Sequence, residues 1–330
     1  MRVPLLKIFG VPTAVALLAA AAFLPCSTQA QSWPAKPLRF IIPQSPGGQV
    51  DVVGRTVAQH LSERLAQPFV VDNRAGANGA IGFEAAAKAP PDGYTLLMSN
   101  QSGLVFAPIV KKSLPYDPIA DFTPVSMLFD TPYYLIVHPS VPARSVQELL
   151  ALARSQPGKL NYATVGVGSG QHLFIEVLKA ATKIDIVHVP YKGAAQAGTD
   201  MLAGSVQIMF QFFGFTVPNA KTGKTRALAS TGARRTDAMP DVPTLGESGV
   251  PGYVAATWYS LSAPARLPRP LVERLNRETS EVLRLASMRE KFAAQDVILL
   301  PGKPEDLTER VRNEAPIFAK IARDAGIEPD

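Results

Sequence analysis

A glycine turn follows the first apolar run after residue 30, "LRFIIP" (38–43). The turn, "QSPGG" (44–48), is followed at once by a helical pattern that starts near Gln49. In an open α/β sheet, ligands bind beyond the carboxyl ends of strands, where turn N–H groups and the positive end of a helix dipole suit an anion. These N–H groups and the helix dipole are enough to bind a carboxylate. A polyphosphate site usually also contains a lysine, and this turn has none. The alternative is that Gly47 and Gly48 only permit a tight turn.

A second turn of this kind lies in "NYATVGVGSGQHL" (161–173). A strand runs into Thr164, three glycines follow, and a helix begins. Ser169 either caps that helix or holds a ligand together with free N–H groups. The segment is not a dinucleotide fingerprint, because Gln171 stands where the third glycine belongs. It is not a nucleophile elbow either, because Val167 occupies the glycine position two before the serine. If the two turns belong to different lobes of the protein, they can both contact one ligand that binds between the lobes.

The histidines do not suggest a metal site. None of the four pairs with another histidine or with a carboxylate at metal-ligand spacing. His172 opens the helix after the second glycine turn, so it either contacts a ligand or has a structural role. A Ser–His–Asp triad needs no fixed spacing, so a secreted hydrolase that uses Ser45 or Ser169 remains an alternative, although nothing in the sequence points to one.

The N-terminus has the layout of a secretory signal peptide. A basic start and an apolar run from Ile8 to Leu24 precede small residues before Gln31. The alternative is a membrane anchor, but the run has 17 residues and contains a proline, and a spanning helix needs about 20. Pro25 before Cys26 disfavours a lipid-modified cysteine. Cleavage after residue 30 leaves 330 − 30 = 300 residues without cysteine, so neither a disulfide nor a thiol nucleophile is expected.

Charge and length limit the function classes. The formal charge is +6 for the whole chain and +4 without the signal peptide, and no basic cluster suggests nucleic acid. The mature length suits two domains. Short apolar runs alternate with helical patterns, which predicts an α/β fold of parallel sheets covered by helices. The predicted strands are 38–43, 69–71, 95–98, 133–137, 161–164, 184–189, 206–213 and 226–229. Proline-rich segments at 114–124 and 243–252 suggest two lobes joined by two crossovers, which suits a hinge around a cleft.

The chain resembles the periplasmic solute receptors of tripartite tricarboxylate transporters, the Bug receptors. The resemblance covers nearly all of the mature chain. Its motifs are "WPAKPLRFIIP" (33–43), "PGGQVD" (46–51), "VVDNRAGANGAIG" (70–82), "PDGYTLL" (91–97), "LPYDPIADFTPVSML" (114–128), "PGKLNYATVGVGSGQHL" (157–173), "VHVPYKG" (187–193), "PDVPTLGESGVPGY" (240–253) and "APARLPRPLVERLN" (263–276).

The resemblance implies a periplasmic binding protein fold of the second type, with two α/β lobes joined by two crossovers around a central cleft. It implies a signal peptide at 1–30, a first lobe of 31–130 and 256–330, and a second lobe of 131–255. It also implies a ligand with a carboxylate, which the two glycine turns hold while the loop "SNQSG" (99–103) approaches from the first lobe. The residues expected at the ligand are Gln44, Ser45, Pro46, Gly47, Gly48, Gln49, Asp51, Asn100, Gln101, Thr164, Gly166, Gly168, Ser169, His172 and Gln211.

A receptor of this family is no enzyme and needs no cofactor or metal. The expected partners are a small organic acid and the membrane permease subunits of the transporter, with delivery in the periplasm by a monomer. A ligand-sensing adaptor for a sensor kinase is the alternative output, because the two differ only in the partner surface. No nucleic acid partner is expected.

The sequence departs from the family pattern at four positions. Gln44 stands where an aromatic residue is usual, Val165 replaces a common serine, Gln196 replaces a proline, and Gln211 stands where an aspartate is frequent. If Gln211 lies near the cleft, the missing negative charge weakens selection for an amino group on the ligand. The sequence therefore favours a plain acid or diacid.

The variant Gln211→Asp tests this preference. The added carboxylate should raise the affinity for amino-bearing acids relative to plain acids of the same length, because it attracts an ammonium group. Calorimetric titration of matched acid pairs measures the ratio, and an unchanged ratio would count against the hypothesis.

Overall fold

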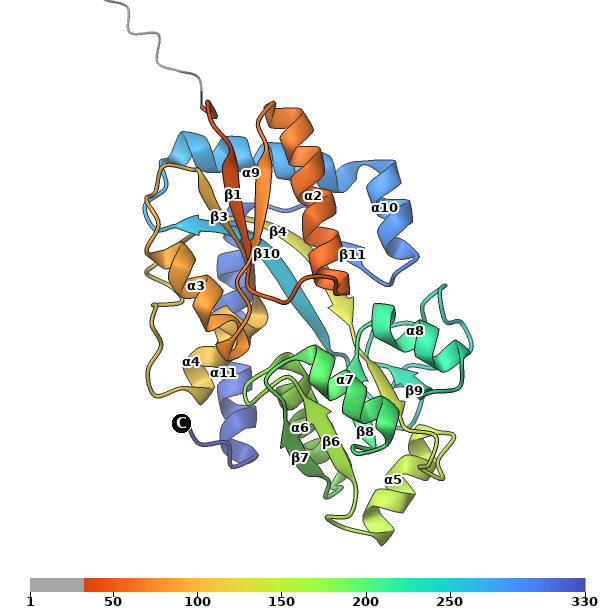
Figure 1. Ribbon diagram of the computed structural model, residues 1–330. Helices are drawn as coiled ribbons and strands as arrows, with labels where there is room; N and C mark the ends of the chain where they lie inside the picture. The colour runs from red at the N-terminus through yellow and green to blue at the C-terminus, as the bar shows by residue number, and fades with distance from the viewer. Residues whose placement is uncertain (1–32, 330) are drawn as a thin grey trace, which may run out of the picture. The chain divides into compact units, whose positions relative to one another are not determined.

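The computed structural model describes residues 33–329, so the expected signal peptide at 1–30 lies outside the described residues. From Lys36 onward the chain forms one compact unit, in which two sheets and their helices make two lobes (Figure 1). Among the described helices, none has the length and apolar character needed to cross a membrane.

The first lobe contains a six-stranded sheet in the order β11-β4-β10-β3-β1-β2. The strands are β1 (Leu38–Ile42), β2 (Phe69–Asn73), β3 (Thr95–Asn100), β4 (Phe122–Pro132), β10 (Ala256–Pro264) and β11 (Ile298–Leu299). The helices of this lobe are α2 (Gln49–Leu65), α3 (Ala80–Ala87), α4 (Ala107–Val110), α9 (Arg269–Arg284), α10 (Ala286–Ala293) and α11 (Pro304–Asp324), with short helical turns η2 (Ala77–Gly79) and η3 (Ser102–Phe106).

Helices cover both faces of this sheet. Successive strand residues point to opposite faces, so Ile41 faces the core that α3 and α11 cover. On the other face, Gly54 of α2 lies so close to Ile42 and Met98 that an added Cβ would be 2.6 and 3.1 Å from their side chains. The near-continuous apolar runs of β1 and β3 follow from this double burial.

The second lobe contains a five-stranded sheet in the order β7-β6-β8-β5-β9. The strands are β5 (Tyr134–Val137), β6 (Asn161–Thr164), β7 (Val187–Pro190), β8 (Ile208–Gln211) and β9 (Arg226–Ser230). The helices are α5 (Val146–Ser155), α6 (Gly170–Thr182), α7 (Ala194–Ala203) and α8 (Phe213–Lys221). The carboxyl ends of β6, β7 and β8 share one edge, because β6 is parallel to both of its neighbours.

The expectation of parallel sheets is wrong for the strands near the crossovers. β10 runs antiparallel to both β3 and β4, and β5 runs antiparallel to β8 and β9. β4 carries the chain out of the first lobe and β10 carries it back, so as neighbours they must run in opposite directions. Neither strand was predicted, because Pro124 in β4 and the serines of β10 interrupt the apolar pattern.

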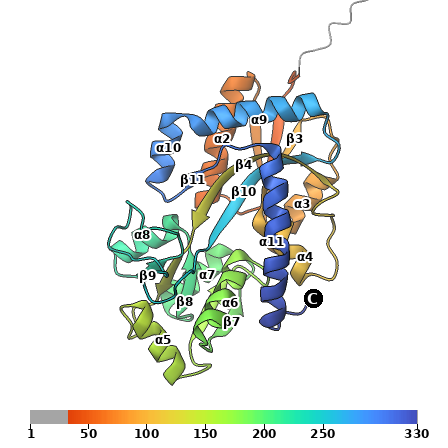
Figure 2. The ribbon, with the colours of Figure 1, turned by 180° about the vertical axis from the view of Figure 1, so that it is seen from behind.

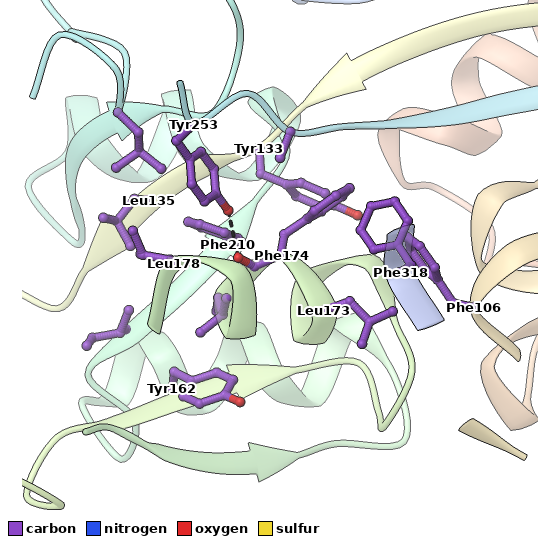
Figure 3. Packing of buried hydrophobic residues seen from close by; sticks show 14 of the residues in the cluster. Phe106, Tyr133, Leu135, Tyr162, Leu173, Phe174, Leu178, Phe210, Tyr253 and Phe318 are labelled. Carbon is purple, nitrogen blue, oxygen red and sulfur yellow. Dashed lines mark hydrogen bonds between the residues drawn. The ribbon is translucent and has the colours of Figure 1, made fainter. Parts of the chain in front are cut away.

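An aromatic cluster joins the two lobes beside α11 (Figure 3). Phe106 of η3 and Phe318 of α11 have ring centroids 4.7 Å apart, and Phe174 of α6 lies 5.9 and 5.7 Å from them. Tyr133, between β4 and β5, also contacts Phe174. Figure 2 shows α11 from behind, running along both lobes, so this helix links the two sheets through apolar packing.

Charged groups fix the same helix to the crossover strands. Arg310 of α11 donates two hydrogen bonds of 2.9 Å to the carboxylate of Asp130 in β4. Glu314, one turn later, accepts from Arg310, from Trp258 Nε1 of β10 at 2.7 Å and from Gln101 Nε2 at 2.7 Å. Such paired geometry is needed to offset the cost of burying the charges.

The packing around Phe83 predicts a stability change for Gly103→Ala. An added Cβ would lie 2.2 Å from the Phe83 ring, which is stacked on Tyr116 at 5.0 Å. Overpacking of this kind costs about 1–3 kcal/mol of unfolding free energy. Chemical denaturation measures the loss. The matched control is Gly246→Ala, where the nearest atom is Thr244 Oγ1 at 3.6 Å; equal stability of the two variants would contradict the packing account.

Candidate functional site

The turn after β1 lies at the carboxyl edge of the first sheet. Gln44 is half-buried. Its side-chain Nε2 donates to Tyr259 Oη at 2.9 Å, and its backbone carbonyl oxygen accepts from Asn73 Nδ2 at 3.1 Å. Residues 45–48 (Ser45, Pro46, Gly47 and Gly48) are exposed. Gln44 is therefore an anchor of the turn, and the four residues after it are available to a ligand.

Asp51 organises this turn from within helix α2. Its carboxylate is only 3 % exposed and accepts hydrogen bonds from Gly47 N, Arg55 Nε and Asn73 Nδ2 at 2.8–2.9 Å. Burial alone would raise the pKa of Asp51, but these hydrogen bonds hold it below its usual value. Gly47 has φ +86°, a conformation that glycine adopts without strain. Asp51 thus shapes the turn and uses the Gly47 N–H to do so.

Gln49 bridges the two lobes. Its Nε2 donates to Gln295 O of the first lobe at 3.1 Å and to Thr131 Oγ1, at the end of the crossover strand β4, at 3.3 Å. Its Oε1 accepts from Gly214 N of α8 at 3.0 Å, in the second lobe. An oxygen acceptor between the lobes is therefore bound by a backbone N–H in the first turn of a helix.

The helices that Gln49 connects both begin at this place. Neither α2 nor α8 has a cap from the side chain of its own N-cap residue, Gly48 and Phe212 respectively. Gln211, just before α8, is 5 % exposed, and its Oε1 accepts from Phe212 N at 3.3 Å. Two helix N-termini that lack a cap from their own N-cap side chain thus meet across the lobes, which is favourable for a negative charge.

The second glycine turn is held by a threonine. Thr164 Oγ1 lies 2.6 Å from His188 Nε2 and accepts from Gly166 N at 3.2 Å. Gly166 has φ +128°, so the turn conformation requires glycine there. Both residues were expected at the ligand, and in this conformation the hydroxyl of Thr164 is engaged within the turn.

Side chains of α6 bind most of the other polar groups of this turn. Ser169 Oγ accepts from His172 N at 3.3 Å, so the serine caps the helix, one of the two alternatives that the sequence left open. Val165 N donates to Gln171 Oε1 at 3.0 Å, and Gly168 N donates to His172 Nδ1 at 3.2 Å. The expectation of free N–H groups in the turn is therefore met only in part.

His172 belongs to a buried stack. Its ring lies 4.1 Å from that of His188, nearly parallel, and His188 in turn stacks on Tyr162 at 4.9 Å. Burial lowers the pKa of His172, and burial together with the charges of His172 and Lys179 lowers that of His188 to about 3. Within residues 33–329, neither Ser45 nor Ser169 hydrogen-bonds a histidine ring, so the geometry gives no support to a serine hydrolase.

The loop "SNQSG" turns its side chains into the first lobe. Asn100 Oδ1 accepts from Gly103 N at 2.9 Å, and Gln101 is bound to Glu314. Ser99 Oγ lies 2.8 and 2.6 Å from the hydroxyls of Ser260 and Ser262 in β10. Asn100 and Gln101 were expected at the ligand, but here they fix the end of β3.

The lobes also meet where the second turn reaches α4. An added Cβ on Gly168 would lie 2.2 Å from Val110 Cγ2, so the two segments are in close contact. Sequence reasoning missed this contact and the partners of Gln49, which are Thr131, Gln295 and Gly214. The local signals in the sequence were Gly48 before α2 and Gly168 before Ser169, the N-cap residue of α6.

Two α/β lobes, joined by two crossover strands and meeting at helix N-termini, define a two-lobed binding protein of the periplasmic type. Residues 53–326 match the model of the tripartite tricarboxylate transporter family receptor. The chain is 36% identical to protein BugT of Bordetella pertussis over 98% of this chain and 97% of that protein. It therefore belongs to the tripartite tricarboxylate transporter receptor family, a family of receptors and not of enzymes.

Solved structures agree with this assignment. Rpa4515 of R. palustris with adipate has a TM-score of 0.86 at 35% identity, over 90% of this chain and 100% of that chain. The periplasmic binding protein BugD has a TM-score of 0.83 at 30% identity, over 90% and 100%. MatC (Rpa3494) from Rhodopseudomonas palustris with bound malate has a TM-score of 0.80 at 29% identity, over 88% and 99%. The predicted two-lobed α/β fold is confirmed.

The histidine stack predicts that stability falls with acidification. Because the folded pKa values of His172 and His188 are lowered, the unfolded chain takes up protons first as the pH falls below about 6.5. Between pH 7 and pH 5 the unfolding free energy should fall by about 2 kcal/mol through His188, and His172 should change it in the same direction. Urea denaturation at both pH values measures this change.

The variant His188→Gln should weaken the pH dependence, because it removes one of the two titrating rings. His138→Gln is the matched control: His138 directly follows the strand β5, outside the stack, and contacts Ser140. A pH dependence unaffected by His188→Gln would contradict the assignment.

Proposed function

We propose that this chain is a periplasmic receptor that binds a small organic acid between its lobes and delivers it to the membrane permease of a tripartite transporter. The observation that carries the proposal is the hydrogen bond from Gly214 N to Gln49 Oε1 across the lobes. It places an oxygen acceptor at two helix N-termini that have no cap from their own N-cap side chain, where a carboxylate gains from both dipoles. Adipate and malate, bound by the related Rpa4515 and MatC, are carboxylates.

The proposed roles of the expected site residues fall into two groups. In the first group, Ser45, Pro46, Gly48 and Gln49 of the exposed turn after β1 and the N-terminus of α2 contact the carboxylate directly. Gly214 of α8, which was not among the expected residues, joins them. The remaining residues set the positions of the turns around the ligand: Gln44, Gly47, Asp51, Asn100, Gln101, Thr164, Gly166, Gly168, Ser169, His172 and Gln211.

We assign residues 31–130 and 256–330 to the first lobe and residues 131–255 to the second. The two sheets draw their strands from these segments, apart from the last two residues of β4. Because β4 and β10 connect the lobes as a pair, a hinge at residues 131–134 and 253–256 lets the lobes separate for solute to enter. We favour transport over kinase signalling because the family is that of transporter receptors.

A thermal-shift panel tests the proposal. The protein is unfolded and refolded to remove co-purified solute, then heated with mono-, di- and tricarboxylates, aromatic acids, amino acids and neutral sugars. A ligand at 100 times its Kd stabilises by about 2.7 kcal/mol, so a carboxylate class should raise Tm by several degrees. If sugars raise Tm and carboxylates do not, the proposal fails.

The variant Gly168→Ala should weaken carboxylate binding at least tenfold, because its Cβ would push against Val110 and hold the lobes apart. Gly252→Ala is the matched control: Gly252 has a similar φ, +75° against +76°, but no atom lies within 4 Å of an added Cβ. Both variants place alanine at a similar positive φ and therefore carry similar backbone strain. They differ in the contact with Val110 of the other lobe, which only Gly168→Ala disturbs. Equal carboxylate affinity in the two variants would contradict a role for the closed lobes.

A further inference from the structure

We infer that Gln44 and Gln211, beyond their part in positioning the turns, select the solute, and that the preferred solute carries a hydroxyl group next to its carboxylate. This inference rests on the proposed function. Two side-chain amide atoms lack an adequate partner: a hydrogen-bond acceptor on Gln44 of the first lobe and a hydrogen-bond donor on Gln211 of the second. A hydroxyl group can serve both, because it donates one hydrogen bond and accepts others.

The side-chain amide of Gln44 is held with its oxygen unpaired. Its Nε2 donates to Tyr259 Oη at 2.9 Å. Tyr259 is fixed in turn, because it is 3 % exposed and stacks on Phe129 with ring centroids 4.7 Å apart. Gln44 Oε1 has no hydrogen-bond partner within residues 33–329, and it is not a buried atom. An acceptor in this state favours a ligand that donates to it, because no hydrogen bond within the protein has to break.

The side-chain amide of Gln211 is held with its nitrogen in excess. Its Oε1 accepts from Phe212 N at 3.3 Å, which fixes the orientation of the amide. Nε2 has two N–H groups, and its partner within the described residues is the sulfur of Met209 at 3.5 Å. A thioether is a weak acceptor, and Gln211 is only 5 % exposed. Buried donors normally have a good partner, so this amide favours a solute that offers an oxygen acceptor.

Both glutamines adjoin the proposed carboxylate site. Gln44 directly precedes the exposed turn 45–48, and Gln211 ends β8, directly before the N-cap residue of α8. The hydrogen bond from Gly214 N to Gln49 Oε1 joins the first turns of α2 and α8. The strand ends that carry the two glutamines therefore flank the same contact between the lobes. The group next to a carboxylate bound there is the part of the solute that the two amides can bind.

The two amides discriminate among the groups at carbon 2 of an acid, the carbon next to the carboxylate. A hydrogen atom pairs with neither amide. An ammonium group donates to Gln44 but offers no acceptor to Gln211, and the positive ends of the two helix dipoles repel it. A hydroxyl group donates to Gln44 Oε1 and accepts from Gln211 Nε2. Because an ordinary hydrogen bond contributes about fivefold in affinity, the hydroxy acid should bind most tightly.

The test compares each acid that stabilises the refolded protein with its 2-hydroxy and 2-amino forms. The sets are propionate, lactate and alanine; succinate, malate and aspartate; and adipate, 2-hydroxyadipate and 2-aminoadipate. Calorimetric titration should give an affinity roughly tenfold or more higher for the hydroxy acid than for the other members of its set. An unsubstituted acid or an amino acid that binds as tightly as the hydroxy acid overturns the inference.

The variants Gln44→Met and Gln211→Met assign the selectivity to the two amides. Methionine keeps nearly the length of glutamine without its amide group. Each variant should lower the ratio of hydroxy-acid to unsubstituted-acid affinity about fivefold, whereas a displaced turn would weaken the binding of both acids alike. Gln207→Met is the matched control. Gln207 lies at the other end of β8, and both of its amide atoms are paired, with Asn161 N at 3.0 Å and Gly204 O at 3.1 Å. It should leave the ratio unchanged.

The outcomes separate the two proposals. An unchanged affinity ratio in Gln44→Met or in Gln211→Met, or equal binding of hydroxy and unsubstituted acids by the wild-type protein, overturns selection by the two amides and leaves the receptor function standing. Failure of every carboxylate to bind the wild-type protein overturns both.

Discussion

The pairing of β4 with β10 is the interaction on which the rest of the structure depends. These strands pair from Phe122 and Pro264 at one end to Pro132 and Ala256 at the other, with two register shifts between. The chain crosses between the lobes twice, and both crossings continue from the Pro132–Ala256 end of this strand pair. The twist of the pair therefore sets how the two glycine turns face each other. Arg310 and Glu314 of α11 fix the pair from one face, through Asp130 of β4 and Trp258 of β10.

The contacts between the lobes are of two kinds, and they lie in different places. Beside α11, aromatic rings of both lobes share one core, including Phe106, Phe174 and Phe318. At the N-termini of α2 and α8, Gln49 makes a polar bridge through single hydrogen bonds. Each such bond contributes about 1 kcal/mol, much less than a buried aromatic cluster. Opening of the lobes should therefore break the polar bridge first, with the aromatic cluster as the fixed side of the hinge.

Local signals in the sequence predicted much of the fold, because turns and caps are set by neighbouring residues. The helix α5 begins after Ser145, whose side chain caps it, and both glycine turns precede helices. The crossover strands were missed because the interior of β10 contains the hydroxyls of Ser260 and Ser262. These hydroxyls can be buried only because they hydrogen-bond to Ser99 of β3. The partners of Gln49 were beyond local reasoning, because they lie 82, 165 and 246 residues away.

The most direct test of the account is an NMR titration of protein labelled with ¹⁵N-glycine, using a carboxylate that stabilises it. The chain has 24 glycines, and Gly→Ala variants assign the signals that matter. The account predicts that the amide signals of Gly48 and Gly214 shift most, because the carboxylate binds at the first turns of α2 and α8. A separate cavity of about 360 Å³ in the second lobe is lined by Gly223. Shifts confined to Gly223, with Gly48 and Gly214 unchanged, would contradict the account.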